Sequence, residues 1–450
     1  MRLLSRWAYL ALLLGDLGVL YLSVFVMLSL RYLSFPDSQI LFLHLYAFSI
    51  LSIFWFLVYF ASGLYGRYTV LFRHSLPITI FIAQIINILI AVIFFFLYPI
   101  ITPKSTLLIY LFVSLILMYV WRILIFPYID IRKESGAILI GTSYELSALA
   151  EEINTDPVYP LEFRAIIHPE LMSSGEIKDT VLTTLKKEDI QALVIDVSNK
   201  AIDDILPFLY DLSFVKKKVI FIDARKLYEE VFEKVPFSLI DDRWILRYMH
   251  LFKLKWYSLF KLLFDYFTGI ILGILCIFLC PILIVLIKLQ DYKKPAFYVS
   301  RRVGYKGKEI KLFKLRTMNG LDSGKSALSS KLKPTKIGSF LRKTRLDELP
   351  QFINLLKGEL SFVGPRPEIP ELAKEYKEQL RYYNLRHSVK PGLSGWAQIK
   401  HSKHPHHKLD IDQTKEKLAY DLYYIQKRGF WFDLYITILT LKIIFTGKGS

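Results

Sequence analysis

Four long blocks of apolar residues fill most of the first 126 positions of the chain. A helix crosses the hydrocarbon core of a bilayer with about 20 apolar residues, and each block reaches that length. The short connections between the blocks carry proline and glycine, which suit turns. The pattern therefore predicts an α-helical bundle of four membrane spans within residues 1–130, at positions 7–30, 41–61, 76–98 and 105–126.

Lysine and arginine are distributed unequally over the two sides of this predicted bundle. Seven of them flank the side on which the bundle begins and ends, and two, Arg31 and Lys104, lie in the connections on the other side. Because short cytoplasmic loops are enriched in these residues, both ends of the bundle are expected to face the cytoplasm. Asp16 lies inside the first block, and we expect it to point into the bundle and to be hydrogen-bonded there.

The hydrophobic pattern changes between residues 131 and 255. The runs AILIG, ALVID and KVIFID are short and rich in β-branched residues, and amphipathic stretches separate them. Buried parallel strands have this character, so the segment is predicted to be an α/β, Rossmann-like domain. A dinucleotide site needs three glycines after the first strand, and Gly141 stands there alone. A packing or regulatory role is therefore favoured over a bound cofactor.

A further apolar run, residues 262–288, is long enough to span a membrane but contains Pro281. Proline inside a straight helix costs ~3 kcal/mol or more. The run has basic residues on both sides, and a fifth span would carry the basic segment after it across the membrane. A re-entrant helix that bends at Pro281 and leaves on the side it entered satisfies both observations.

Cys276 and Cys280, four residues apart in this run, are expected to pack as small apolar side chains. The apolar run at 430–445 is short for a span and is predicted to lie in the membrane interface.

The charge of the chain is concentrated in one segment. The whole chain carries a net charge of +18, and residues 288–429 contain 31 Lys and Arg against 14 Asp and Glu, a net charge of +17. Such a segment attracts anionic lipids or phosphorylated substrates. Nucleic acid is a less natural partner for a segment that is tied to a membrane.

Within this basic segment, the adjacent acids Asp347 and Glu348 stand between arginines in the stretch LRKTRLDELPQFINLLKGELSFVGPRP. The apolar positions after them have helical spacing, so a helix is predicted to begin near Asp347, with that residue as its N-cap. The alternative is a reaction site. A carboxylate can attack phosphorus as a nucleophile, cations stabilise a diphosphate, and paired acids can hold Mg²⁺. The basic residues of KEIKLFKLRTM upstream and Arg366 downstream favour the reaction site.

Several blocks of this region resemble, in order, the signature blocks of the bacterial polyprenyl-phosphate sugar-1-phosphate transferases. The blocks are KLFKLRTM, the stretch around Asp347, HSVKPGLSGWAQI and a late acidic motif, YDLYYIQ, which contains Asp421. The segment FDYF…CP resembles the family's re-entrant membrane helix. The resemblance runs from about Trp256 to the C-terminus. It implies a mixed α/β catalytic domain over residues 256–450, with the re-entrant helix at 262–288 and with interfacial helices.

Four spans followed by a Rossmann-like domain at 131–255 resemble the large polytopic subgroup, the undecaprenyl-phosphate glucose or galactose phosphotransferase-like proteins. These start the assembly of O-antigen, capsule or exopolysaccharide. The resemblance implies transfer of a sugar 1-phosphate from a UDP-sugar to undecaprenyl phosphate, with release of UMP. It places the protein in the bacterial inner membrane, with the catalytic domain on the cytoplasmic face, among membrane lipids and as a possible homodimer.

The same resemblance implies roles for individual residues. Asp347 would be the nucleophile that forms an aspartyl-phosphosugar, and Glu348 would help to position Mg²⁺, with both acids as candidate metal ligands. The family's bend often reads Ser-Pro, whereas this chain has Cys280-Pro281, which lacks the hydroxyl group. The remaining positions are the phosphate-binding Lys314, Arg316, Arg342 and Arg366, the structural acid Asp265, the bend at Pro281, and Asp421 of the late motif.

Two other functions compete with this one. A membrane-bound sugar-nucleotide dehydratase or epimerase needs G-x-G-x-x-G and a Tyr-x-x-x-Lys pair in its nucleotide domain. The glycines are absent, and the Tyr-x-x-x-Lys spacing at Tyr423 and Lys427 lies far outside that domain, where chance explains it. An anionic-lipid-binding scaffold would explain the charge but not the acid pair between arginines. The histidines of HSKHPHHKLD are expected to lie in a surface loop, because Pro405 breaks any helix that would align them on zinc.

Overall fold

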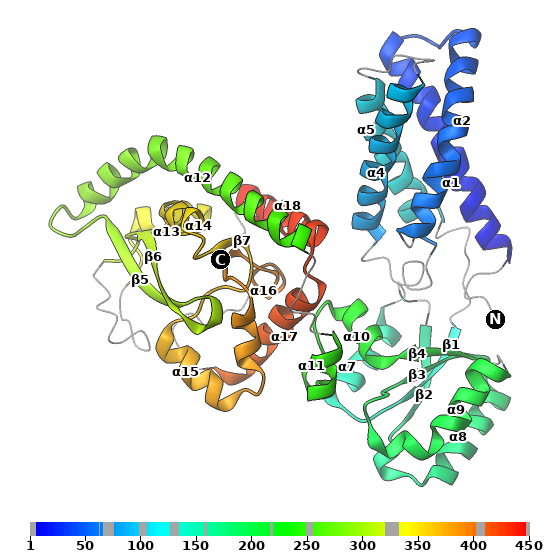
Figure 1. Cartoon of the computed structure of the whole chain (residues 1–450). Coiled ribbons are helices and arrows are strands. Elements are labelled where there is room, and N and C mark those ends of the chain that lie inside the picture. Colours follow the sequence, from blue (N-terminus) through cyan, green and yellow to red (C-terminus); the bar gives the residue numbers. More distant parts are fainter. Residues whose placement is uncertain are drawn as a thin grey trace. The chain divides into compact units, whose positions relative to one another are not determined.

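The computed structural model describes residues 6–62, 64–65, 76–98, 106–126, 135–156, 159, 161–216, 219–248, 255–319, 333–401 and 410–446. The chain divides into two compact units, Met1–Val231 and Phe232–Ser450. Figure 1 shows the apolar helices and the sheet of the first unit and the mixed helices and strands of the second.

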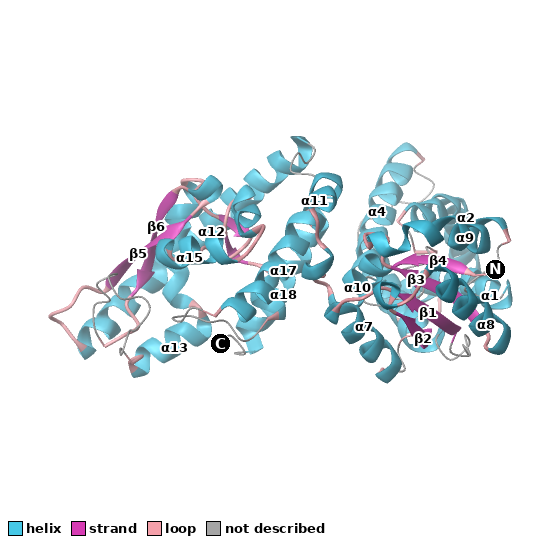
Figure 2. Cartoon of the chain, turned by 90° about the horizontal axis from the view of Figure 1, so that it is seen from below, coloured by secondary structure: helices cyan, strands magenta, loops and turns pink. Residues whose placement is uncertain are grey.

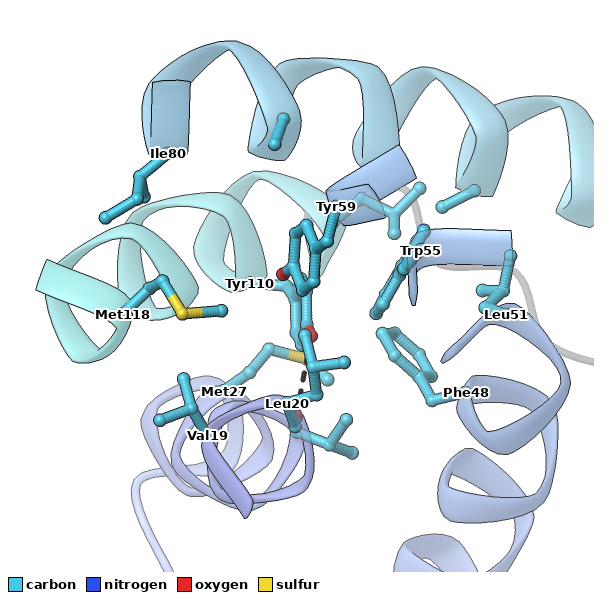
Figure 3. Packing of buried hydrophobic residues seen from close by; sticks show 14 of the residues in the cluster. Val19, Leu20, Met27, Phe48, Leu51, Trp55, Tyr59, Ile80, Tyr110 and Met118 are labelled. Carbon is cyan, nitrogen blue, oxygen red and sulfur yellow. Dashed lines mark hydrogen bonds between the residues drawn. The ribbon is translucent and has the colours of Figure 1, made fainter. Parts of the chain in front are cut away.

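The N-terminal part consists of apolar helices whose large side chains interlock. The helices are α1 (Arg6–Tyr32), α2 (Ser38–Ala61), α4 (Leu76–Leu97) and α5 (Thr106–Tyr119), and a π-helical turn continues α5 to Ile125. Trp55 stacks on Tyr110 with ring centroids 5.3 Å apart, and Phe48 lies 5.0 Å from Tyr110 (Figure 3). In the described part of the chain, these four helices and α12 of the second unit are long and apolar enough to cross a membrane.

The expectation for Asp16 is confirmed. Its carboxylate is fully buried and accepts hydrogen bonds from the Nε of Arg122 at 2.9 Å, the hydroxyl of Tyr65 at 2.5 Å and the indole N–H of Trp121 at 3.1 Å. A second guanidinium nitrogen of Arg122 completes a bidentate pair. Paired charges are what an apolar surrounding tolerates, so these contacts give Asp16 a structural role.

A four-stranded parallel sheet follows in the first unit. Its strands lie in the order β2-β1-β3-β4: β1 (Ser135–Ile140), β2 (Leu161–Ile167), β3 (Ile190–Ile195) and β4 (Ile220–Asp223). Figures 1 and 2 show α7 (Tyr144–Thr155) and α10 (Ala224–Phe232) on one face and α8 (Ser174–Lys187) and α9 (Leu206–Tyr210) on the other. Helices cover both faces of the sheet, which explains why its strands are continuous apolar runs. The prediction of buried parallel strands is confirmed.

The second unit packs helices around an antiparallel hairpin and a short parallel pair of strands (Figure 2). The hairpin joins β5 (Phe297–Val303) to β6 (Glu309–Leu315), and β7 (Ser361–Val363) pairs with β8 (Gly392–Ser394). The helices are α11 (Asp242–Tyr248), α12 (Lys255–Gln290), α13 (Lys336–Thr344), α14 (Phe352–Leu356), α15 (Pro370–Gln379), α16 (Trp396–Lys400), α17 (Ile411–Lys427) and α18 (Phe430–Thr446).

Residues 233–244 belong to this second unit. Val235 and Trp244 lie in its core, and the indole N–H of Trp396 donates to the backbone oxygen of Glu233 at 2.9 Å. The boundary between the compact units thus falls well before residue 255, where the sequence predicted the middle domain to end. The division into three domains stays a prediction.

Helix α12 lies along the second unit over most of its length. It continues through Pro281 without interruption, and Figure 1 shows it as an arch. A Cβ added at Gly273 of α12 would lie 3.0 Å from the ring of Phe352, the first residue of α14. Helices α12 and α14 are therefore in close contact at this glycine. The opposite side exposes large apolar side chains, such as Phe278 at 71% and Leu289 at 77%. The buried positions recur every three or four residues, at Asp265, Gly269, Gly273, Cys276, Cys280, Leu283 and Ile287.

Candidate active site

The acid pair lies on a short 3-10 helix between α13 and α14. Helix α13 ends at Thr344, Arg345 has a left-handed backbone with φ of 54°, and the 3-10 helix runs from Leu346 to Gln351. Arg345, rather than Asp347, occupies the N-cap position, and no side chain caps this helix. The prediction that Asp347 is an N-cap is therefore wrong. The left-handed backbone of Arg345 turns the chain just before the acid pair. Asp347 therefore lies within the first turn of the 3-10 helix.

Glu348 is surrounded by cations. Lys314 Nζ lies 2.9 Å from its Oε1, Arg366 Nη2 lies 3.1 Å from the same oxygen, and Arg345 Nη1 lies 3.7 Å from Oε2. Burial alone would raise the pKa of Glu348, but the three cations outweigh it and hold the pKa well below its usual range. Glu348 is thus a permanent anion that fixes the positions of three cations.

Asp347 differs from its neighbour in its contacts. The residue is 8% exposed, and its carboxylate makes no hydrogen bond or ion pair with another described residue. Burial, reinforced by the negative charge of Glu348, raises the pKa of Asp347 to about 6, although Lys314, Arg366 and Arg342 act in the opposite direction. At pH 7 the group is still about nine-tenths ionised. The site therefore holds an unpaired carboxylate amid cations, which is what a nucleophile for an anionic phosphate requires.

Arg366 follows strand β7, which is hydrogen-bonded to α12. Asp265 of α12 accepts from the Ser361 hydroxyl and from the Phe362 N–H, both at 2.9 Å. Lys261 of α12 donates to the Val363 carbonyl oxygen at 2.9 Å. Strand β7 is thus fixed to α12 three residues before Arg366.

Two groups hold Lys261 in place from outside α12. Asp433 of α18 pairs with its Nζ at 2.7 Å, and the hydroxyl of Tyr424 lies 3.2 Å from it. The same hydroxyl lies 3.1 Å from the Val363 carbonyl oxygen and 3.0 Å from a carboxylate oxygen of Asp433, so its single proton is donated to one of these two acceptors. Lys261, Tyr424 and Asp433 were not predicted as site residues. In the sequence, Lys261 is one of the basic residues that precede the apolar run 262–288.

The other two predicted phosphate ligands have different surroundings. Arg342, on the last turn of α13, donates from Nε to the Thr317 hydroxyl at 3.1 Å and adds its charge to the field at Asp347. Arg316 is buried, and its Nη2 donates to the backbone oxygen of Asp291, just after the end of α12, at 3.0 Å. Its contacts are those of a residue that caps α12, and its role in phosphate binding stays a prediction.

Asp421 takes part in a buried network behind Arg366. It pairs with Arg386 at 2.9 Å, and Arg386 also donates to the backbone oxygen of Arg366 at 2.8 Å. Burial raises the pKa of Asp421. Glu368 lies 3.8 Å from Arg386 and 2.7 Å from Lys417; although burial opposes the shift, these cations lower the pKa of Glu368 to about 2. Asp421 therefore acts on the site indirectly: it binds Arg386, which in turn binds the backbone of Arg366.

Comparison with known proteins places the second unit in a family. Residues 256–447 match the family described as bacterial sugar transferase, and this range contains every candidate site residue named above. Over 194 residues the chain is 37% identical to a protein of Bacillus subtilis named "Uncharacterized sugar transferase EpsL", covering 89% of that protein. The chain belongs to the bacterial sugar transferase family.

Longer relatives of this family carry more specific names. The chain is 38% identical over 169 residues to the UDP-N-acetylgalactosamine-undecaprenyl-phosphate N-acetylgalactosaminephosphotransferase of Aeromonas hydrophila. It is 40% identical over 159 residues to the UDP-glucose:undecaprenyl-phosphate glucose-1-phosphate transferase of Escherichia coli. These matches cover 37% and 35% of this chain and only 39% and 34% of the two relatives.

The predicted Mg²⁺ site fits the acid pair only in part. A direct bond from Glu348 to a metal ion does not fit, because Lys314 and Arg366 already contact its Oε1. Asp347 has free carboxylate oxygens, but a single carboxylate needs phosphate and water ligands beside it to hold Mg²⁺. No cluster of three or more His, Cys, Asp or Glu side chains suited to a metal occurs among the described residues. Of the histidines in the predicted surface loop, positions 404, 406 and 407 lie outside those residues.

Proposed function

We propose that this chain transfers a sugar 1-phosphate from a UDP-sugar to undecaprenyl phosphate, releasing UMP and starting a lipid-linked surface polysaccharide. The observation that carries the proposal is the unpaired carboxylate of Asp347 amid Lys314, Arg342, Arg345 and Arg366. The names of the relatives from Aeromonas and Escherichia support the substrate class.

The residues account for a two-step reaction. A carboxylate oxygen of Asp347 attacks the sugar-bearing phosphorus, the bond from that phosphorus to the UMP oxygen breaks, and UMP leaves as an anion. A phosphate oxygen of the lipid then attacks the same phosphorus, and the acyl-phosphate bond to Asp347 breaks. Neither step requires a proton. The cations at Glu348 stabilise the charge that spreads over the phosphoryl oxygens in each step.

The placement of α12 supports a re-entrant position in the membrane. Its 36 residues are about 54 Å long, well beyond the ~30 Å of a hydrocarbon core. Polar groups near its two ends bind the same soluble unit: Lys261 binds β7 and α18 near the start, and Arg316 binds the backbone of Ile287 and Asp291 at the end. A straight crossing would draw that unit into the hydrocarbon. Both ends of α12 are therefore proposed to lie on the cytoplasmic side.

The remaining architecture belongs to the same proposal. Residues 1–130 would cross the inner membrane four times, and the parallel sheet would form a Rossmann-like domain without a dinucleotide. Mg²⁺ would be carried by the donor's diphosphate rather than by Glu348. A homodimer is proposed only from the likeness to the large subgroup.

The test is formation of product by the full chain in membranes. UDP-glucose, UDP-galactose and their N-acetylated counterparts are each supplied with undecaprenyl phosphate and Mg²⁺, and UMP and the lipid-diphosphosugar are measured. One of these donors should give both products in equal amounts. Failure of all four, by a chain that is folded and inserted, would contradict the proposal.

A matched pair of variants ties the result to the site. Asp347→Asn should abolish turnover, because an amide cannot form the acyl phosphate. Asp242→Asn removes a carboxylate that lies on the surface and pairs with Arg381, so it should leave turnover unchanged.

A further inference from the structure

Helix α13 has one face packed on the protein and one face exposed. Ile337 and Leu341 pack in the same cluster as Leu283 and Ile287 of α12. A Cβ added at Gly338 would lie 1.9 Å from the backbone oxygen of Thr317, so α13 is in direct contact with the chain on this side. The helix therefore has a fixed rotation about its own axis.

The exposed face combines an aromatic ring with two cations. Lys336, Phe340 and Lys343 follow at i, i+4 and i+7, which places them on one side of the helix. Phe340 is 56% exposed, both lysines are exposed, and neither lysine makes an ion pair with a described residue. An exposed aromatic ring between lysines is typical of a surface at the level of lipid headgroups.

The charge of this region has one sign. The described residues 333–346 contain no Asp or Glu. Their cations attract anions, and each Lys or Arg near an anionic membrane surface contributes about 1 kcal/mol of attraction. The cations are Lys333, Lys336, Arg342, Lys343 and Arg345.

The position of α13 connects the membrane helix to the acid pair. On one side it packs against the C-terminal half of α12, whose outer side chains Ile282, Val285 and Leu289 are exposed and apolar. At its own end only Arg345 and Leu346 separate it from Asp347. A lipid phosphate at the membrane surface would reach Asp347 along this helix.

We propose that the exposed face of α13, formed by Lys336, Phe340 and Lys343, is the docking surface for the phosphate end of the isoprenyl phosphate acceptor. This proposal rests on the proposed function and adds to it the route of the second substrate. The lysines bind the monophosphate, which carries more negative charge than a phospholipid diester, and Phe340 contacts the first isoprene units. The donor does not need this surface, because it reaches the site from solution.

The two half-reactions separate the roles of donor and acceptor. The variants are the double substitution Lys336→Gln with Lys343→Gln, and Phe340→Ser, all in the full chain. The matched control is Lys374→Gln with Lys377→Gln, two exposed lysines of α15. UMP release from the UDP-sugar without lipid should be unchanged in every variant. The KM for undecaprenyl phosphate should rise about thirtyfold in the lysine variant, since two surface charges are lost, and remain normal in the control.

The outcomes distinguish this inference from the function on which it rests. Restored acceptor KM in Lys336→Arg with Lys343→Arg would support a role for charge. An unchanged acceptor KM beside normal UMP release would overturn the docking surface and leave the function intact. Weaker flotation of the lysine variant with phosphatidylglycerol vesicles, with an unchanged acceptor KM, would also overturn it and would indicate a general membrane anchor. Absence of UMP release from the wild-type chain would count against the proposed function itself.

Discussion

Replacing Asp347 by asparagine is expected to stabilise the protein at neutral pH while it removes activity. Burial beside Glu348 raises the pKa of Asp347 from 3.8 to about 6, which means that the folded state disfavours the ionised form. Two pKa units correspond to roughly 3 kcal/mol. The sign follows from linkage: above pH 6 the carboxylate is ionised in both states and destabilises the fold, whereas below its unfolded pKa it is neutral in both and has no effect. Asparagine is neutral throughout.

The assay is thermal unfolding of the detergent-solubilised full chain, followed by tryptophan fluorescence. At pH 7.5 the Asp347→Asn protein should unfold several degrees above the wild type, and at pH 4 the difference should nearly vanish. Asp242→Asn, on the surface, should show no such pH-dependent difference. An Asp347→Asn protein that is less stable at pH 7.5, or a stabilisation that is the same at both pH values, would refute the view that this carboxylate is held ionised at a cost.

Three further outcomes follow from the same geometry. The kcat/KM for the UDP-sugar should rise about tenfold between pH 5 and pH 7, because only ionised Asp347 attacks; a flat profile would exclude that group. Lys261→Met removes the lysine donor to the Val363 oxygen and leaves Asp433 without its ion pair, so kcat should fall by at least tenfold, with partial recovery in Lys261→Arg. A normal kcat would argue against a positioning role for Lys261. Gly364→Ala would place a Cβ 2.5 Å from the backbone oxygen of Lys390, shift Arg366 and raise the donor's KM, whereas an unchanged KM would show that this loop adapts.

The sequence is most informative where chemistry and spacing coincide. The acid pair, Lys314 and Arg366 stand out as candidate site residues in the sequence alone, and the fold brings both cations within hydrogen-bonding distance of Glu348. Arg345 does not stand out in this way. Its contact with Glu348 depends on a left-handed backbone, which non-glycine residues rarely adopt and which no local pattern signals.

The contacts of Arg316 and Asp421 could not be derived from spacing. Arg316 lies two residues after Lys314 in a basic run, yet it bonds to a backbone about 25 residues earlier in the chain. Asp421 acts through Arg386, a partner that only the packing of α17 reveals. For α12, a signal did exist: small or polar residues recur every three or four positions from Asp265 to Cys280, and they mark the buried face of an otherwise apolar helix.

The covalent intermediate on Asp347 is the central claim, and single-turnover chemistry tests it most directly. The full chain is mixed with its UDP-sugar in the absence of lipid. The molar amount of UMP released is then compared with the molar amount of protein. We predict release of no more than one UMP per chain, a sugar-phosphate mass adduct on the peptide that contains Asp347, and loss of that adduct when undecaprenyl phosphate is added. UMP release that requires the lipid, or near-normal turnover by Asp347→Asn, would contradict it.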